Sequence, residues 1–258
     1  IYRKWEIWDE FQQPFFDRVL GAAAASTTVR PAQKPAAGAA AAPRLVALKR
    51  YLPALLRAAV ITIVLSCLAM ALAIGLGVLV ATGRVYGGAL TRAVLTTYVE
   101  ITRGTPVLLQ LFVLYYGLSA VIKLPAFVAA LLGLGLNYAA YESEIYRGAM
   151  EAVPRGQLES ARTLGFTEFQ VFRLVRGPQA FRLALAPMTN DFVALLKDSS
   201  LVSVITVVEL TKQTQIFAAN IGSWAIPGAL CAALYLVMSL PLARLARRLE
   251  TRWRAASA

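Results

Sequence analysis

Apolar residues in this chain gather into long windows that contain no charged residue. The longest lies between Arg57 and Arg84, where 26 consecutive residues are uncharged. At about 1.5 Å per helical residue, this window is longer than the roughly 30 Å hydrocarbon core of a bilayer. Similar windows occupy residues 104–122, 124–141 and 213–243, and a weaker one, interrupted by charge, occupies 191–208. The pattern predicts an all-α, polytopic membrane protein with five transmembrane helices.

The spans should follow these windows, with breaks where the sequence disfavours a helix. We expect helices at about residues 57–82, 92–120, 125–152, 183–209 and 224–248. The second should be irregular at Thr102–Pro106, because glycine and proline both weaken a helix interior. The third ends in charged residues, where Glu142 and Glu144 are expected to gather around Arg147. Pro154 then requires a break.

Composition supports a membrane protein and argues against several other classes. The chain is 58% hydrophobic and 16% charged, with a mean hydropathy of +0.61, which is too apolar for an ordinary soluble domain. It contains no histidine, the commonest general base and metal ligand. Cys67 and Cys231 lie inside apolar windows and are expected to pack there. We therefore expect no catalytic residue and no metal site, and we favour transport.

The net charge of +12 has a membrane explanation that does not involve nucleic acid. If the N-terminus lies outside, the inside segments 83–92, 147–182 and 244–258 hold 13 of the 26 Lys and Arg residues. An excess of basic residues marks the cytoplasmic side. Basic residues at 44–57 lie on the opposite side and weaken this orientation. We expect an outside N-terminus and a cytoplasmic C-terminus.

The first 50 residues differ from the rest. Residues 1–20 are polar and aromatic, and residues 21–50 are rich in alanine and proline, which is typical of a linker. The chain opens on Ile1, so residues 1–20 are interpreted as the C-terminal remnant of an upstream domain; the alternative is a disordered extension. The membrane domain should then cover 51–250, followed by a tail at 251–258.

A polar segment between the third and fourth spans predicts two short helices. Gln157–Leu164 should form the first and end at Gly165, which suits a left-handed C-terminal cap. The second should run from an N-cap at Thr167 to Val175 and stop at Gly177–Pro178. A connection of this length is long for a simple link, and such loops are often functional.

This segment resembles the cytoplasmic signature of bacterial ABC importer permeases, which is E-A-A, three residues, G, nine residues, then I-x-L-P. Here the match is Glu159, Ser160, Ala161 and Gly165, followed after nine residues by Val175 to Pro178. Serine replaces an alanine, valine an isoleucine and Gly177 a leucine, but the spacing is intact. The resemblance implies a cytoplasmic coupling helix that contacts an ATPase, with these expected coupling residues: Gln157, Glu159, Ser160, Ala161, Leu164, Gly165 and Phe166.

The resemblance covers most of residues 51–250. RGTPVLLQLF, AAYESEIYRGAMEAVPRGQLESA, GPQAFRLAL and NDFVALLKDSSLVSVITVVEL are similar to permeases for polar amino acids, such as histidine, glutamate, glutamine, arginine and opines. IYRKWEIWDEF is similar to the last helix of an amino-acid-binding protein, which some relatives fuse to the permease. The resemblance implies the type I ABC importer permease fold in the bacterial inner membrane.

The same resemblance implies a set of partners. Nothing in the chain resembles GxxxxGK[ST], so ATP and Mg²⁺ should bind to a separate ATPase, present in two copies, and no cofactor to this chain. A second permease subunit, most simply in a homodimer, and a fused or separate substrate-binding protein complete the assembly. We expect this chain not to be an enzyme.

Ionisable residues in the expected fourth span are candidates for the transport path, because charge is costly at membrane depth. Asp191 and Asp198 are seven residues apart and should share a face, whereas Lys197 should point elsewhere. We expect the acidic face to contact an ammonium group or a cationic side chain. Alternatively, Asp191 lies at the membrane interface, and Lys197 and Asp198 pair with neighbouring helices.

Three further residues could contribute to that path. Ser199 and Ser200 could add hydroxyl contacts, although small residues more often serve helix packing. Arg103 could meet a substrate carboxylate, although a structural pair with Glu100 is favoured.

Three other classes remain as alternatives. An ion-gradient-driven secondary transporter would favour internal repeats and paired broken helices, which we do not find. A membrane-embedded enzyme would need an acid–base cluster. A purely anchoring protein would not need buried Asp and Lys.

Overall fold

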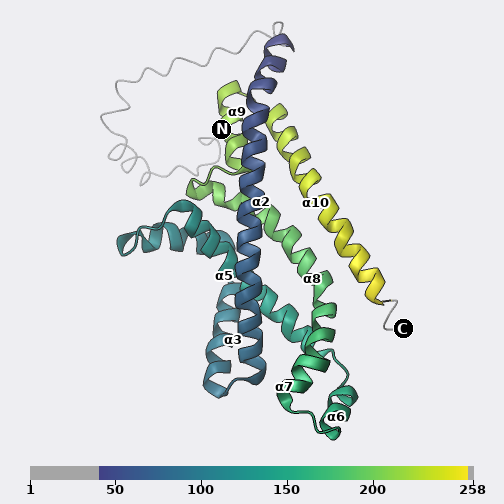
Figure 1. Ribbon diagram of the computed structural model, residues 1–258. Helices are drawn as coiled ribbons and strands as arrows, with labels where there is room; N and C mark the ends of the chain where they lie inside the picture. The colour runs from purple at the N-terminus through teal and green to yellow at the C-terminus, as the bar shows by residue number, and fades with distance from the viewer. Residues whose placement is uncertain (1–40, 255–258) are drawn as a thin grey trace, which may run out of the picture. The chain divides into compact units, whose positions relative to one another are not determined.

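Figure 1 shows the computed structural model of the chain, which describes residues 41–254 as helices and short connections without a strand. All contacts discussed below lie within residues 48–254. The predictions for residues 1–20, for 21–40 and for 255–258 fall outside the described residues.

Two helices are long and apolar enough to cross a membrane by length and hydropathy. They lie at Tyr51–Tyr86 and Ala225–Arg248 in the described part of the chain. The first belongs to α2 (Ala41–Tyr86) and the second to α10 (Ala225–Arg254), so both helices extend beyond the predicted spans. The other three expected spans are either split or interrupted by polar side chains.

The second expected span is split where the sequence predicts an irregularity. It consists of α3 (Ala89–Gly104), α4 (Val107–Phe112), a π-helical turn (Val113–Gly117) and a 3₁₀ turn (Leu118–Ala120). Thr105 and Pro106 adopt extended backbone conformations between α3 and α4. The Gln110 amide donates to the carbonyl oxygens of Thr102 at 2.8 Å and of Thr105 at 3.3 Å. The Gln110 side chain thus donates to carbonyl groups that lose their helical hydrogen bonds at the break.

The third and fourth expected spans pack against each other as α5 (Ala126–Glu151) and α8 (Gly177–Asp198). Their shared core contains fully buried Leu134 and Leu195, with Leu111 of α4 and Leu65 of α2. Gly133 of α5 allows this packing, because a Cβ atom there would come within 2.6 Å of the Leu111 side chain, which would have to shift. α5 lies between α8 on one side and the α3–α4 segment on the other.

The predicted boundaries of the fourth span are wrong at both ends. Gly177–Pro178 does not stop the preceding helix: the Gly177 N–H donates to the Phe172 carbonyl, five residues back, and a π-helical turn (Val171–Arg176) leads directly into α8. Proline is tolerated near the start of α8, because a first-turn N–H has no helical partner. At the other end, the α-helix gives way after Asp198 to a 3₁₀ turn (Ser199–Ile205).

A helix that the sequence pattern did not predict, α9 (Leu210–Ile221), precedes α10. The fully buried Glu209 caps it, accepting hydrogen bonds from the backbone N–H groups of Thr211 and Lys212 at 2.8 Å each. The Tyr235 hydroxyl of α10 donates to the same carboxylate at 3.1 Å. These three donors compensate for the burial of the carboxylate.

Candidate functional site

The polar segment between α5 and α8 forms the two predicted elements. Its first helix, α6 (Arg155–Thr163), ends at Leu164 and Gly165, where Gly165 has φ +85°. The Phe166 N–H reaches back to the Ala161 carbonyl at 3.2 Å and closes the end of the helix. The prediction of a left-handed glycine after this helix is confirmed, and the reason is steric, since side chains disfavour this conformation.

The second element begins at Thr167, as predicted. Thr167 and Gln170 form a capping box around α7 (Glu168–Gln170), in which each side chain bonds to the backbone N–H of the other. The Arg162 guanidinium pairs with the Glu168 carboxylate at 2.6 Å and links α6 to α7. This hydrogen bond lowers the pKa of Glu168 below its usual value. We call residues 155–176 the coupling segment.

Most of the predicted coupling residues lie on the surface of the coupling segment. Ala161 is buried, and with Leu158 it packs against Val153, Val171 and Ala180. The side chains exposed on the opposite side include Leu164, which is 76% exposed, and Phe166. The remaining predicted residues are also exposed: Gln157, Glu159, Ser160 and Gly165. One face of α6 therefore holds the segment to the bundle, while the other stays open.

A second feature lies inside the bundle, at the α3–α4 break. A cavity of about 450 Å³ opens there between the break, α5 and α8. We call it the acidic cavity, because Asp191 and Asp198 both line it, as expected for residues on one face of α8. Its lining consists of Arg103, Gly104, Thr105, Pro106, Val107, Asn137, Tyr138, Tyr141, Asp191, Ala194 and Asp198.

The charged groups of the acidic cavity are held in different ways. The Tyr138 hydroxyl donates to Asp198 Oδ2 at 2.8 Å. One carboxylate oxygen of Asp191 is buried and has no hydrogen-bond partner among the described residues. Arg103 lies over the Tyr141 ring, with its guanidinium carbon 5.3 Å from the ring centroid. The cavity thus presents two carboxylates and one guanidinium to whatever enters it.

The other candidates for the transport path lie elsewhere. Ser199 is fully buried and donates to the Leu196 carbonyl at 2.8 Å, and neither it nor Ser200 lines the acidic cavity. Lys197 is exposed and points away from the cavity lining, as expected. Arg103 and Glu100 are not among the ion pairs of the described residues, so the favoured structural pair is absent there.

Of the two glutamates predicted to gather around Arg147 at the charged end of α5, only Glu144 does so. Glu144 binds Arg147 at 2.7 Å and also pairs with Arg84 of α2. The prediction that Glu142 joins this group is wrong. Glu142 is fully buried, and neither of its carboxylate oxygens has a hydrogen-bond partner among the described residues. Tyr146 lies beside it without hydrogen-bond geometry. Residues two apart on a helix point in different directions, so these neighbours meet different surroundings.

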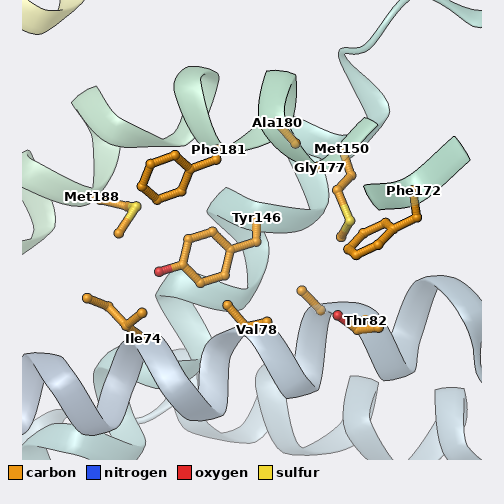
Figure 2. A pocket seen from close by; sticks show the side chains of 11 residues that line it. Ile74, Val78, Thr82, Tyr146, Met150, Phe172, Gly177, Ala180, Phe181 and Met188 are labelled. Atoms are coloured by element: carbon orange, nitrogen blue, oxygen red, sulfur yellow. The ribbon is translucent and has the colours of Figure 1, made fainter. Parts of the chain in front are cut away.

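A second, apolar cavity of about 150 Å³ separates α2 from the region where the coupling segment joins α8. Figure 2 shows Tyr146 at its centre, between Val78 and Thr82 of α2 on one side and Phe181 and Met188 of α8 on the other. Phe172 of the coupling segment lines the same space.

Comparison with known proteins identifies the family. Residues 73–255 match the family described as "Binding-protein-dependent transport system inner membrane component". The chain belongs to this family. The permease is 35% identical over 205 residues to the glutamine transport system permease protein GlnP of Escherichia coli (strain K12), a match that covers 78% of this chain and 93% of the relative.

Three further comparisons agree with this family. It is 30% identical to the histidine/lysine/arginine/ornithine permease protein HisQ of the same bacterium, over 72% of this chain and 86% of the relative. A crystal structure of an amino acid ABC transporter with histidines aligns with a TM-score of 0.76 and 34% identity, covering 80% of this chain and 97% of that chain. Inward-facing structures of the MetNI methionine transporter share the fold, with a TM-score of 0.59 and 19% identity. The predicted ABC importer permease fold is confirmed.

Several residues of the permease's acidic cavity were missed by the sequence reasoning. Tyr138 and Asn137 of α5 line it, and Gln110 holds Asn137 in place by accepting a hydrogen bond from its amide at 3.2 Å. Asn137 interrupts the apolar window 124–141 and was the signal that could have drawn attention to α5. Tyr138 gave no such signal, because aromatic residues are common throughout membrane helices.

Proposed function

We propose that the permease is a subunit of an ATP-driven importer of polar or charged amino acids in the bacterial inner membrane. It would form the transport path and couple that path to a separate ATPase. GlnP is named for glutamine, and HisQ for histidine, lysine, arginine and ornithine. These relatives support an amino acid as the substrate, and the lining of the acidic cavity supports a polar or cationic one.

The acidic cavity is the observation that carries the choice of substrate. Its volume of about 450 Å³ suits a single small molecule. Its carboxylates, Asp191 and Asp198, would bind the α-ammonium group or a cationic side chain, and Arg103 would bind the α-carboxylate. With two acidic groups against one basic group, the cavity favours zwitterionic and cationic amino acids over anionic ones.

The coupling segment supports the assignment of an ATPase partner. The open face of α6, with Glu159 and Leu164 exposed, would lie in a cleft of the ATPase, which would bind ATP and Mg²⁺. Two ATPases, a permease homodimer and a substrate-binding protein would make up the assembly. In this arrangement, the coupling segment lies in the cytoplasm and the C-terminus on the same side, with the N-terminus outside.

Movement of α6 would reach the transport path through α8. Closure of the two ATPases would push the two α6 helices together and rock the membrane helices from inward-open to outward-open. The apolar cavity beside Phe172 and Phe181 leaves room for such a movement, whereas Tyr138 and Asp198 tie α8 firmly to α5 nearer the acidic cavity. A displacement at the coupling segment would therefore be passed to the cavity lining.

Copurification with an ATPase and reconstitution test this function. We expect a stoichiometric ATPase to copurify with the permease, and ATP hydrolysis by the complex in liposomes to rise with one amino acid and its binding protein. Uptake of labelled amino acid should require internal ATP and persist when ion gradients are collapsed. Uptake that follows an ion gradient without an ATPase would instead support a secondary transporter.

A further inference from the structure

A third cavity, at the end of the bundle where the coupling segment attaches, is lined by arginines from four separate elements. It measures about 360 Å³. Arg84 comes from the last turn of α2, Arg92 from the first turn of α3, Arg147 from the end of α5 and Arg176 from the end of the π-helical turn before α8. We call it the arginine cavity.

Carboxylates neutralise two of these four guanidinium groups. Glu144 pairs with Arg84 and Arg147, and Glu151 pairs with Arg147 at 2.8 Å. Within the described residues, no carboxylate forms an ion pair with Arg92 or Arg176. The cavity therefore holds an excess of positive charge that the bundle itself does not balance.

Neutral groups hold the two unbalanced arginines in place. Arg92 Nε donates to the Arg84 carbonyl at 3.1 Å. Arg176 Nε donates to the Met150 carbonyl at 2.9 Å, its Nη1 donates to the Tyr86 hydroxyl at 3.0 Å, and its guanidinium lies over the Tyr86 ring. Within the part of the chain that the structure describes, the two Nη atoms of Arg92 and the Nη2 atom of Arg176 have no hydrogen-bond partner, so they can donate to a ligand. Oriented guanidinium groups with free donors suit the oxygens of a phosphate group.

The position of the arginine cavity favours a phosphate that belongs to a lipid. The cavity lies where α2, which is long and apolar enough to cross a membrane, ends and α3 begins, and the end of such a helix would lie near the lipid headgroups. Leu90 is 79% exposed and Val94 is 60% exposed; each is two positions from Arg92 and therefore lies on a different face of α3 from the cavity. A phospholipid could place its phosphate among the arginines while its acyl chains lie along the outside of the helices.

We propose that the arginine cavity binds the phosphate group of an anionic phospholipid. Basic cavities between membrane helices attract such headgroups, and each arginine near the surface contributes favourably. Because Arg176 is the last residue of the coupling segment, bound lipid would tie α2, α3 and α5 to the segment that contains α6. The inference does not depend on the identity of the transported substrate.

Native mass spectrometry of the full chain, purified in detergent and exposed to defined lipids, tests this site. We expect phosphatidylglycerol to be retained in preference to phosphatidylcholine. Replacing Arg92→Gln or Arg176→Gln should weaken retention about fivefold each, because a surface arginine contributes about 1 kcal/mol to anionic lipid binding. Arg173→Gln is the matched control, since Arg173 is exposed in the same π-helical turn and does not line the cavity.

Each alternative has its own outcome in this experiment. Equal loss of phosphatidylglycerol in Arg173→Gln would reduce the effect to general charge attraction and overturn the site. Displacement of the lipid by millimolar inorganic phosphate, with phosphate protecting the folded protein equally well, would assign the cavity to free phosphate. Unchanged lipid retention together with loss of a copurifying partner protein would assign it to that partner.

A folding defect must be separated from a binding defect. Arg176 has three structural contacts, and its replacement can disturb the fold, whereas Arg92 has one hydrogen bond, through Nε. Arg92→Gln should therefore elute as a folded protein and still lose lipid. If this folded variant retains phosphatidylglycerol as wild type does, the proposal is wrong whatever happens to Arg176→Gln.

Discussion

The coupling segment takes its shape from neighbours in sequence, whereas the acidic cavity is assembled from four helices, α3, α4, α5 and α8. Thr167 with Gln170, Arg162 with Glu168, and the left-handed Gly165 shape the coupling segment within a few turns of chain. In the acidic cavity, Tyr138 reaches Asp198 across 60 positions of sequence. The coupling segment is also open to water, while the cavity groups are surrounded by apolar helices, where each polar contact is stronger and each unpaired group more costly.

This difference predicts how each region responds to substitution. Changes on the open face of α6 should affect coupling and leave the stability of the bundle nearly intact. Changes among the buried carboxylates should affect stability or substrate binding, according to which partner is lost. Four experiments, in order of decreasing expected effect, test this separation.

Asp198→Asn tests the acidic cavity, and we expect the largest effect there. Losing a charged hydrogen bond to the substrate should weaken amino acid transport by about 10- to 100-fold, because such bonds contribute about 1.5–3 kcal/mol. The measurement is uptake into liposomes as a function of substrate concentration. Tyr138→Phe is the control, since it removes the internal partner of Asp198 and keeps the carboxylate. Unchanged transport in Asp198→Asn would remove Asp198 from the transport path.

Gly165→Asp tests the coupling segment. A side chain at φ +85° is strained by about 1–2 kcal/mol, enough to shift the arrangement of α6 about tenfold. We expect the subunit to remain folded, while ATP hydrolysis no longer drives uptake at the wild-type ratio. The measurement is the number of substrate molecules moved per ATP hydrolysed.

Gly156→Asp provides the matched control for Gly165→Asp. It places the same side chain in the first turn of α6, where nothing lies within 4 Å and φ is ordinary. This position favours a negative charge, so coupling should be preserved. Full coupling in Gly165→Asp would refute the assigned role of the segment.

The same contrast explains what the sequence could predict. Glycine at a helix end and threonine before a short helix are local signals, so α6, Gly165 and the Thr167 cap were all predicted correctly. The α3–α4 break was also predictable, from Gly104 and Pro106. The acidic cavity was predictable only in part: helical spacing places Asp191 and Asp198 on one face, but nothing local indicates that Tyr138 or Arg103 would face them.

The predictions that were wrong depend on three-dimensional contacts, which the order of apolar and polar residues along the chain does not reveal. Gly177–Pro178 looks like a stop, yet a π-helical turn carries the chain through it. The mixed segment around residues 199–224 contains a capped helix that its sequence does not indicate, because Glu209 finds three donors that lie partly on another helix. Glu142 and Glu144 look alike in sequence, and their different surroundings depend on which neighbour each meets.

Glu144→Gln and Glu142→Gln compare these two carboxylates. Glu144 binds two arginines, so its replacement should lower stability by about 2 kcal/mol, a shift of a few degrees in the thermal midpoint. Glu142 has no hydrogen-bond partner to lose, so its replacement should leave the midpoint unchanged or raise it. Thermal unfolding of both variants in the same detergent gives the comparison. If the thermal midpoint fell further in Glu142→Gln than in Glu144→Gln, the Glu142 carboxylate would have a stabilising partner in the folded protein.

Glu168→Gln should have the smallest effect. Its ion pair with Arg162 is fully exposed, and exposed pairs contribute little because water and salt screen them. Because the pKa of Glu168 is lowered in the folded protein, the small stabilisation is present at neutral pH and is lost as the pH falls through that lowered pKa. The thermal midpoint of the variant should match that of wild type at neutral pH, and coupling should be nearly normal, because the capping box of Thr167 and Gln170 is untouched. Loss of coupling at an unchanged midpoint would show instead that the link between α6 and α7 transmits the movement, and that contacts within the segment matter as much to function as its open face.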